Sequence, residues 1–266
     1  MKKMKNLEKK LGIFICSHKD FIPQVSNETG CYRVAFAGDA PREIEGFKTY
    51  SCKPNIQNGL DDKFYSELYM MRYLADNVEL PEWVGICHYR RYWRIDSPEI
   101  IADAIDNNHV DLFVRQEMKL LYDNRTQYNI AHNVEDLDIV GHIIAEKFPE
   151  YKPSFDEFIK TNSFFPYNMS IMKREDFIEL VNFQFAVLDE YLKIVGTDIT
   201  KRIEDNKEKY LKDFSPNNTA DYQYRIGGYL GERLTNVFII KHFSDKFKTI
   251  GKMNIDVTEE KYGLKF

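Results

Sequence analysis

Residues 88–93 combine a histidine, two adjacent arginines and three aromatic side chains, directly after an apolar segment, 83–87, that has the pattern of a buried strand. Two guanidiniums form a fork that suits an anion such as a diphosphate, and the flanking rings can stack on a base or a sugar. In open α/β sheets, ligands bind just beyond the carboxyl ends of strands. The segment therefore predicts a diphosphate site formed by Tyr89, Arg90, Arg91 and Tyr92.

The pattern leaves the role of each of these side chains open. Adjacent residues of a strand point to opposite faces, so one arginine could face the ligand while the other braces the sheet. An exposed arginine pair with surface salt bridges is the alternative. His88 could act as a base, as a donor to a phosphate, or as a packed histidine at the end of a strand.

A second polar group, Ser17, His18 and Lys19, ends or follows the first predicted strand. In doubly wound sheets the loop after the first strand meets the nucleotide, so we expect a donor contact here, with a solvated turn as the alternative. The chain contains neither a GxGxxG nor a GxxxxGK[ST] sequence, so neither a dinucleotide fold nor a P-loop is indicated.

The composition sets broad limits on the function. The 266 residues are 43% hydrophobic and 30% charged, with a formal net charge of −5. This is enough material for a core in one large or two small domains, and the negative balance argues against a general nucleic-acid binder. The negative net charge is still compatible with a local basic pocket at the arginine pair. No segment approaches the roughly 20 apolar residues needed to cross a bilayer.

The four cysteines show no CxxC spacing, so neither a zinc knuckle nor a redox pair is indicated. Cys16 and Cys87 lie inside apolar strand patterns and are expected to be buried thiols, which fits a reducing cytoplasm. Residues 1–10 form a basic tail, and the apolar run after it is too short for a signal peptide.

The hydrophobic periodicity predicts strands and helices that alternate in the first two thirds of the chain, followed mostly by helices. Strands are expected at 12–17, 32–36, 83–87, 110–114 and 167–172, and helices at 61–77, 97–107, 124–147 (in two pieces), 154–160, 174–195 and 219–242. Residues 46–58 and 215–218 are expected to be irregular, and 201–212 a solvated helix or loop.

This order predicts an α/β sheet with a helical C-terminal part packed on it. The chain has no internal repeat and no low-complexity linker. We therefore expect one domain, 1–266, with a nucleotide-sugar-binding α/β part at 11–172 and a helical part at 173–245.

The HYRRYW run and five further blocks closely resemble the sequence blocks of a family of bacterial capsular and exopolysaccharide biosynthesis proteins, and they occur in the same order. This family is catalogued as a domain of unknown function. The hallmark of that family is a strand ending in HYRRYF. The other blocks are IFICSHK (13–19), YSEL (65–68), AHNVEDLD (131–138), YNMSIM (167–172) and GYLGERL (228–234). The chain departs from the pattern at Trp93, which replaces Phe, and at Gly227 and Gly228, where a bulkier pair is common; these changes could alter the sugar or acceptor pocket.

The resemblance implies a glycosyltransferase with a GT-A-like fold, a Rossmann-type mixed sheet flanked by helices. It implies a nucleotide-sugar donor, expected to be uridine-linked, and a role in building capsule, O-antigen or exopolysaccharide. Some relatives transfer galactofuranose, so UDP-galactofuranose and UDP-galactose are candidate donors. The expected acceptor is an oligosaccharide or a lipid-linked glycan. We expect a cytoplasmic protein, and the basic tail could contact an anionic membrane surface.

Many GT-A enzymes hold a divalent metal with a DxD motif at a strand end, and here His88 to Arg91 take that position. We infer that Arg90, Arg91 or both replace some or all of the metal's charge. The literal DxD, Asp136 and Asp138, lies at a predicted helix start, where the two carboxylates would point about 200° apart. No metal site is therefore predicted, and a need for Mn²⁺ or Mg²⁺ stays open.

An inverting transfer needs a base for the proton of the acceptor hydroxyl. The candidates are Glu135, Asp136 and His132, with His88 as a further one. Helix-start acids are also favoured by the helix dipole, which gives them a structural alternative.

The remaining candidates come from helices and a strand around the hallmark. Ser66, Glu67 and Arg72 lie on the helix before it and are assigned to the donor, with capping and a surface ion pair as alternatives. Asn168 could reach the donor sugar. Glu232 and Arg233 could bind the acceptor, or could pair with each other inside the protein.

Two other functions would use the same arginine fork or the same pocket. The first is phosphoryl or glycosyl-phosphate transfer, and the second is a non-catalytic module that binds a nucleotide sugar or a glycan. Product analysis separates them, because only glycosyl transfer releases a free nucleoside diphosphate.

Overall fold

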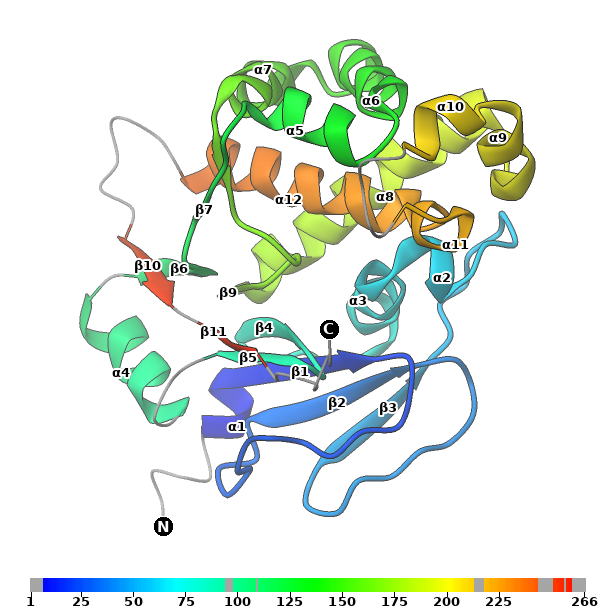
Figure 1. Cartoon of the computed structure of the whole chain (residues 1–266). Helices are drawn as coiled ribbons and strands as arrows, with labels where there is room; N and C mark the ends of the chain where they lie inside the picture. The colour runs from blue at the N-terminus through cyan, green and yellow to red at the C-terminus, as the bar shows by residue number, and fades with distance from the viewer. Residues whose placement is uncertain are drawn as a thin grey trace.

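The computed structural model describes residues 7–93, 98–108, 110–212, 218–243, 251–255 and 257–259, and its centre is a mixed sheet (Figure 1). In this described part, nine strands form the sheet, and a two-stranded ribbon joins β7 (Met118–Lys119) to β8 (Ser163–Phe164). The sheet strands are β1 (Leu11–Ser17), β2 (Tyr32–Ala37), β3 (Lys48–Cys52), β4 (Trp83–His88), β5 (Arg91–Trp93), β6 (Val110–Arg115), β9 (Ser170–Lys173), β10 (Gly251–Ile255) and β11 (Val257–Glu259).

The strand order is β10-β6-β9-β4-β1-β2-β3, and β5 pairs with both β4 and β11. β1 runs parallel to its neighbours β2 and β4, whereas β9 is antiparallel to both β4 and β6. The register places Cys16 of β1 opposite His88 of β4, so the two strands end side by side. Side chains that follow these two strands therefore meet at one edge of the sheet.

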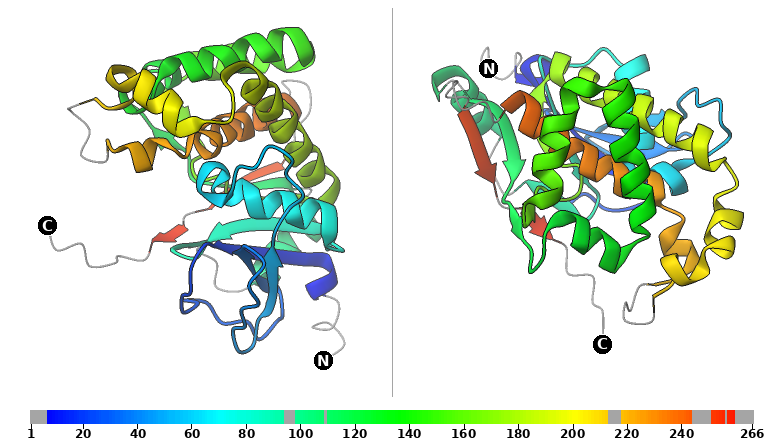
Figure 2. Two further views of the ribbon diagram at one scale, coloured as in Figure 1. Left: turned by 90° about the vertical axis from the view of Figure 1, so that its right-hand side faces the viewer. Right: turned by 90° about the horizontal axis from the view of Figure 1, so that it is seen from above.

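The helices gather mainly over one face of the sheet, as Figures 1 and 2 show. They are α1 (Leu7–Lys10), α2 (Asp62–Tyr65), α3 (Glu67–Asn77), α4 (Pro98–Asn108), α5 (Asn124–Ala131), α6 (Val134–Lys147), η2 (Pro149–Tyr151), α7 (Lys152–Lys160), α8 (Arg174–Val195), α9 (Ile199–Asp205), α10 (Lys207–Tyr210), α11 (Ala220–Gln223) and α12 (Ile226–Phe243). None of these described helices combines the length and the apolar composition that a membrane crossing needs.

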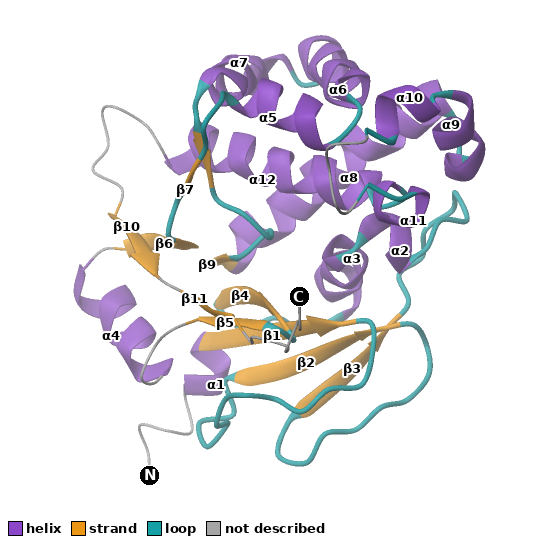
Figure 3. Ribbon diagram, viewed as in Figure 1, coloured by secondary structure: helices purple, strands orange, loops and turns teal. Residues whose placement is uncertain are grey.

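The alternation of side chains along β1 explains why both faces of the sheet are covered. Phe14 and Cys16 point into the larger apolar core beneath α3, α8 and α12, whereas Ile13 and Ile15 belong to a second core on the opposite face. That second face is closed by α4 and by the long loops that join β1 to β2 and β2 to β3 (Figure 3). Cys16 and Cys87 are buried free thiols, as expected.

Most predicted elements are confirmed, including the division of 124–147 into α5 and α6. Several boundaries differ. Strand β3 lies within 46–58, which was expected to be irregular. The segment 201–212, expected to be a solvated helix or loop, is mostly helical, with α9 beginning earlier, at Ile199, and α10 following it. The predicted helix 219–242 is divided into α11 and α12. Residues 1–6 of the basic tail and 215–217 of the segment expected to be irregular lie outside the described residues, as does Ser97, the first residue of the helix predicted at 97–107.

The predicted helix 61–77 is interrupted at Ser66, because α12 approaches it closely. A Cβ atom on Gly228 would lie 2.6 Å from Ser66 Oγ, and one on Gly227 would lie 2.5 Å from the Phe64 ring. These glycines therefore permit a helix contact that a larger side chain would block. The unusual Gly227-Gly228 pair serves to bring α12 against the junction of α2 and α3.

Candidate active site

A cavity of about 330 Å³ opens at the carboxyl ends of β1 and β4. It is lined by the ends of these strands, the β4–β5 hairpin, the α2–α3 junction, Tyr167, and the segment from α11 to α12. Nine of the residues singled out from the sequence line it, namely Ser17, His18, Ser66, Glu67, His88, Tyr89, Arg90, Arg91 and Glu232. Segments far apart in the sequence are thus brought together where a parallel sheet presents ligand sites.

The HYRRYW run forms a tight hairpin, in which His88 of β4 pairs with Arg91 of β5. Both arginines line the cavity. The guanidinium carbon of Arg90 lies 5.2 Å from the centroid of the Tyr89 ring, and that of Arg91 lies 4.0 Å from the Tyr167 ring. These ring contacts orient the two cations.

Two buried aromatic residues hold this hairpin from below and do not line the cavity. The Tyr92 hydroxyl donates to the Tyr89 carbonyl oxygen at 3.0 Å, and Trp93 Nε1 donates to the Ile86 carbonyl oxygen at 3.2 Å. Tyr92, assigned to the donor from the sequence, therefore supports the hairpin. Trp93, which replaces the family's Phe, adds a hydrogen bond that Phe cannot make.

Four cationic and three acidic side chains line the cavity, in a chain whose net charge is −5. Lys63 and Arg225 face it in addition to the arginine pair. Burial, and after it the nearby Arg225, lowers the pKa of His18. Lys19 Nζ lies 5.3 Å from the Tyr89 ring centroid, just beyond the lining residues. The acids are Asp62, Glu67 and Glu232, and Lys63 pairs with Asp221 at 2.6 Å, so the formal balance of the lining is +1 (4 − 3). Because a cleft focuses the field of its charges, this excess favours an anion.

Ser17, at the end of β1, is buried and closes a local turn. Its hydroxyl donates to the Lys19 carbonyl oxygen at 2.6 Å and accepts from the Lys19 amide at 3.2 Å. The hydroxyl thereby shapes the loop that carries His18 and Lys19, as Ser and Thr side chains commonly do after strands.

Backbone strain is concentrated at this cavity. Among the described residues, the non-glycine residues with positive φ are Ser66 (52°), Tyr167 (71°) and Asn168 (52°). Ser66 and Tyr167 line the cavity, and Asn168 contacts Glu67, which also lines it. Each such residue costs about 1–3 kcal/mol and persists only where its surroundings hold it. The left-handed pair at 167 and 168 also explains why the predicted strand 167–172 begins only at Ser170.

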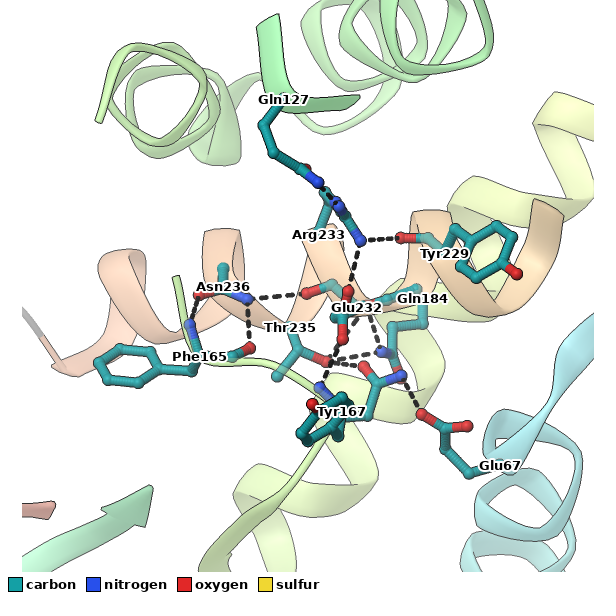
Figure 4. Close-up of polar contacts among 12 residues, drawn as sticks. Glu67, Gln127, Phe165, Tyr167, Gln184, Tyr229, Glu232, Arg233, Thr235 and Asn236 are labelled. Carbon is teal, nitrogen blue, oxygen red and sulfur yellow. Dashed lines mark hydrogen bonds and ion pairs between the residues drawn. The ribbon is translucent and has the colours of Figure 1, made fainter. Parts of the chain in front are cut away.

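Helix α12 supplies the contacts that hold this strained turn (Figure 4). Glu232 Oε1 accepts a hydrogen bond from the Tyr167 amide, and Asn236 exchanges hydrogen bonds of 2.7 and 2.9 Å with the backbone of Phe165. Burial raises the pKa of Glu232. Arg233 pairs with Glu232 and donates to Gln127 Oε1 at 2.9 Å, away from the cavity. Glu232 and Arg233, which were assigned to the acceptor, thus form the internal ion pair.

Glu67 and His88 lie side by side at the back of the cavity. Glu67 Oε1 accepts a hydrogen bond of 2.7 Å from Asn168 Nδ2 and lies 3.8 Å from His88 Nε2. His88 Nε2 lies 2.8 Å from the carbonyl oxygen of Tyr167. Asn168 is buried behind the wall, so it contacts a cavity residue without lining the cavity itself.

An aromatic wall, Tyr222 and Tyr229, closes the cavity on the side of α11 and α12. The ring centroids of the two tyrosines lie 5.3 Å apart. His132 stacks behind this wall, with its ring centroid 4.0 Å from that of Tyr229, and it contacts Gln223 Oε1 through Nδ1 at 3.1 Å. Burial lowers the pKa of His132 to about 3.

The carboxylates predicted at the start of α6 lie elsewhere. Asp136 has no exposed surface and accepts hydrogen bonds from Tyr191 (2.7 Å), Tyr210 (2.6 Å) and Arg202. Glu135 is exposed and pairs with Lys209 at 2.5 Å. The structure therefore brings neither carboxylate to the cavity, and a sugar hydroxyl does not reach Asp136.

Arg72 also lies outside the cavity. It bonds to Asp76 and, at 2.8 Å, to Asn182 Oδ1, and it lines a separate hollow of about 550 Å³ between α3 and α8. Arg72 therefore forms an ion pair with Asp76, which was the alternative to a role in donor binding.

The described residues do not offer a conventional divalent-metal site. In the described ranges, no group of three or more His, Cys, Asp or Glu side chains is placed to hold a metal ion. Asp136 is enclosed by its buried partners, while Asp138 pairs with Arg125 at 2.7 Å, so the DxD carboxylates face different ways. In the cavity, the oxygens of Glu232 are already engaged by Tyr167 and Arg233.

The sequence analysis missed several residues of the cavity, chiefly Asp62, Lys63, Tyr167, Tyr222 and Arg225. The sequence contains a pattern that could have indicated two of them, Tyr222 and Arg225. Tyr222 and Arg225 recur with Tyr229 at intervals of three and four residues, which places polar and aromatic groups on one face of a helical segment. That face was expected to be part of a continuous helix and was not assigned a role.

Known proteins identify the family of this chain and share its fold. No curated protein matches the sequence. The structure resembles that of the WbbM bifunctional glycosyltransferase in its apo form, with a TM-score of 0.68 and 19% identity, over 94% of this chain and 45% of that one. The chain thus spans less than half of that structure, and the likeness confirms the expected GT-A-like fold class. A family model described as a domain of unknown function, DUF4422, matches residues 12–243, and the chain therefore belongs to this family.

Proposed function

We propose that the chain is a glycosyltransferase that moves a sugar from a nucleotide-sugar donor to a hydroxyl group of a glycan. The observation that carries this proposal is the convergence of four cationic side chains on one cavity at the ends of β1 and β4 in an acidic chain. These side chains are Lys63, Arg90, Arg91 and Arg225. The fold shared with a glycosyltransferase structure supports the same conclusion.

The chemistry of the cavity fits the departure of a diphosphate. Cleavage of the bond between the anomeric carbon and the diphosphate leaves negative charge on the leaving group, which guanidiniums can stabilise through paired hydrogen bonds. Arg90 and Arg91 line the cavity from the hairpin, and Arg225 lines it from the segment between α11 and α12. We propose that these cations supply the positive charge that a metal supplies at a DxD motif. Tyr222 and Tyr229 offer ring faces on which a base or a sugar can stack.

The finer assignment follows the family resemblance. We propose a uridine-linked donor, with UDP-galactofuranose and UDP-galactose as the first candidates, and an oligosaccharide or lipid-linked glycan as acceptor. The product would be a bacterial surface glycan such as capsule, O-antigen or exopolysaccharide. A cytoplasmic location, with a membrane contact through residues 1–10, stays a prediction.

A donor screen tests the proposal. The protein is incubated with UDP, UDP-galactose, UDP-galactofuranose and UDP-glucose, with and without Mn²⁺, and the melting temperature and the release of UDP are measured. A donor that binds the native state raises the melting temperature, and the proposed function predicts both this rise and free UDP. Arg225→Ala should weaken UDP binding, whereas Arg125→Ala, which removes an arginine paired with Asp138 outside the cavity, should not.

The products decide between this function and its alternatives. Release of a sugar phosphate in place of UDP would indicate glycosyl-phosphate transfer. Binding of UDP-sugars without any turnover, including turnover with glycan acceptors, would indicate a binding module. Absence of both binding and turnover with every donor would contradict the proposed function.

A further inference from the structure

Several side chains of the cavity could accept a proton, and their hydrogen bonds distinguish them. Glu232 is committed to the fold, because Oε1 accepts from the Tyr167 amide and Oε2 pairs with Arg233. Burial and the neighbouring Arg225 lower the pKa of His18, and its ring packs edge-on against the Tyr89 ring, with 5.5 Å between the two centroids. Glu232 therefore does not suit the removal of a proton from a sugar hydroxyl.

His88 is oriented as a hydrogen-bond donor. Its Nε2 atom lies 2.8 Å from the carbonyl oxygen of Tyr167, and a carbonyl oxygen can only accept. Nε2 must therefore carry a hydrogen, and it cannot take a second proton. The same nitrogen lies 3.8 Å from Glu67 Oε1, so the imidazole ring also faces this carboxyl group.

Glu67 differs from the other cavity acids in having one oxygen held and the other available. Oε1 accepts from Asn168 Nδ2 at 2.7 Å, whereas Oε2 takes part in no hydrogen bond recorded with the described residues. The side chain is 12% exposed, at the wall of the cavity. Such a carboxylate is fixed in direction and keeps lone pairs for a substrate hydroxyl.

A buried chain of polar groups fixes the partner of Glu67. Asn168 Oδ1 accepts from the Thr235 hydroxyl at 2.6 Å, and Thr235 Oγ1 accepts from Gln184 Nε2 at 2.9 Å (Figure 4). These three side chains are buried. Thr235 and Gln184 determine which end of the Asn168 amide faces Glu67, and they help to hold Asn168 at its positive φ of 52°. A strained residue held in this way next to a cavity commonly serves the function of that cavity.

We propose that Glu67 is the catalytic base of the transfer, and this inference rests on the proposed function. Glu67 Oε2 takes the proton of the acceptor hydroxyl while the hydroxyl oxygen forms a bond to the anomeric carbon of the donor. The bond from that carbon to the diphosphate oxygen breaks, and its electron pair remains on the diphosphate beside Arg90 and Arg91. This single displacement inverts the configuration at the anomeric carbon. Asn168, Thr235 and Gln184 are positioning residues.

Glu67→Gln provides the direct test, because it keeps the shape of the side chain and removes its basicity. The turnover of the donor found in the screen should fall by about 10²–10⁴-fold, the usual contribution of a general base. The Kd for UDP should stay within about twofold, which also shows that the variant is folded. Glu175→Gln, an exposed acid paired with Arg174, is the matched control and should leave turnover unchanged.

A second variant gives a readout that a structural role would not change. Asn168→Asp places a second carboxylate against Glu67, so the acidic limb of the pH–rate profile should move to higher pH by about one unit or more. Glu67 also interacts electrostatically with His88, Glu232 and Cys16. These three groups are the same in the variant and the wild type. An unchanged acidic limb would contradict the role of Glu67.

Four further results would overturn the assignment. The first is turnover of Glu67→Gln within threefold of the wild type, and the second is loss of UDP binding together with turnover in that variant. The third is a large loss of turnover in Asp62→Asn with no loss in Glu67→Gln. The fourth is retention of the configuration at the anomeric carbon. Each leaves the proposed function intact, because the wild-type protein would still bind UDP-sugars and release UDP. Failure of the wild type in the donor screen is a different result, and it would contradict the proposed function itself.

Discussion

The guanidinium of Arg91 lies over the ring of Tyr167, with 4.0 Å between its central carbon and the ring centroid. This contact joins the hallmark hairpin to the strained turn before β9, whose backbone is held by Glu232. The direction of a cavity cation therefore depends on a residue 76 positions later in the chain (167 − 91). Four predictions follow from contacts of this kind.

Arg91→Lys should reduce kcat/KM for the donor by about 10- to 100-fold, although the charge is kept. Lysine lacks the planar fork that binds two phosphate oxygens and stacks on Tyr167, and charged hydrogen bonds of this kind contribute about 1.5–3 kcal/mol. Steady-state kinetics of UDP release measures the effect, with Arg125→Lys as the control outside the cavity. Turnover close to that of the wild type in both Arg90→Lys and Arg91→Lys would contradict the role of the pair.

Asp136→Asn should destabilise the protein by about 3–5 kcal/mol, because it leaves the Arg202 guanidinium without its buried partner. Urea unfolding of the variant and the wild type measures this change. Glu135→Gln is the matched variant on the same helix turn. Its exposed pair with Lys209 should contribute no more than about 1 kcal/mol. If Asp136→Asn were as stable as the wild type yet inactive, Asp136 would be catalytic after all.

Gly228→Ala should destabilise the protein by about 1–3 kcal/mol and raise KM for the donor, because the new methyl group would press on Ser66 Oγ, 2.6 Å away. The double variant with Ser66→Gly removes the hydroxymethyl group and suits the positive φ of 52° at this position. It should recover most of the lost stability. Equal losses in the single and the double variant would show that the contact is not the cause.

Stability should fall as the pH drops from about 6.5 towards 3, in part because His132 is buried in its neutral form. The folded state holds the pKa of His132 at about 3, so only the unfolded chain takes up the proton at intermediate pH. Between pH 7 and pH 5 this costs about 2 kcal/mol. In His132→Gln the unfolding free energy should fall less over this interval, while the contributions of His18 and His242 cancel. Parallel pH profiles for the two proteins would refute the prediction.

The sequence predicts well those features that depend on neighbouring residues. The apolar run before HYRRYW predicts the strand β4, which is confirmed, and both arginines that follow it line the cavity. Their binding of an anion stays a prediction. The pattern of 124–147 similarly predicts a helix in two pieces, which are α5 and α6. Local pattern is sufficient here because a strand end and a helix start are set by adjacent side chains.

The remaining features depend on contacts between distant segments. Asp136 looks like a free acid at a helix start, and its burial becomes visible only when α9 and α10 bring Arg202 and Tyr210 against it. Arg225 joins the cavity because glycines of α12 allow that helix to pack against Ser66. Such partners leave no periodic signal near the residue they affect, so pattern alone does not reveal them.

The central claim is that the cationic cavity binds the diphosphate of an activated sugar, and a crystal structure of the protein with UDP tests it most directly. The claim predicts the diphosphate in the cavity at the ends of β1 and β4, within hydrogen-bond distance of the guanidinium of Arg90 or Arg91. A diphosphate bound elsewhere, with both guanidiniums turned towards solvent, would contradict it.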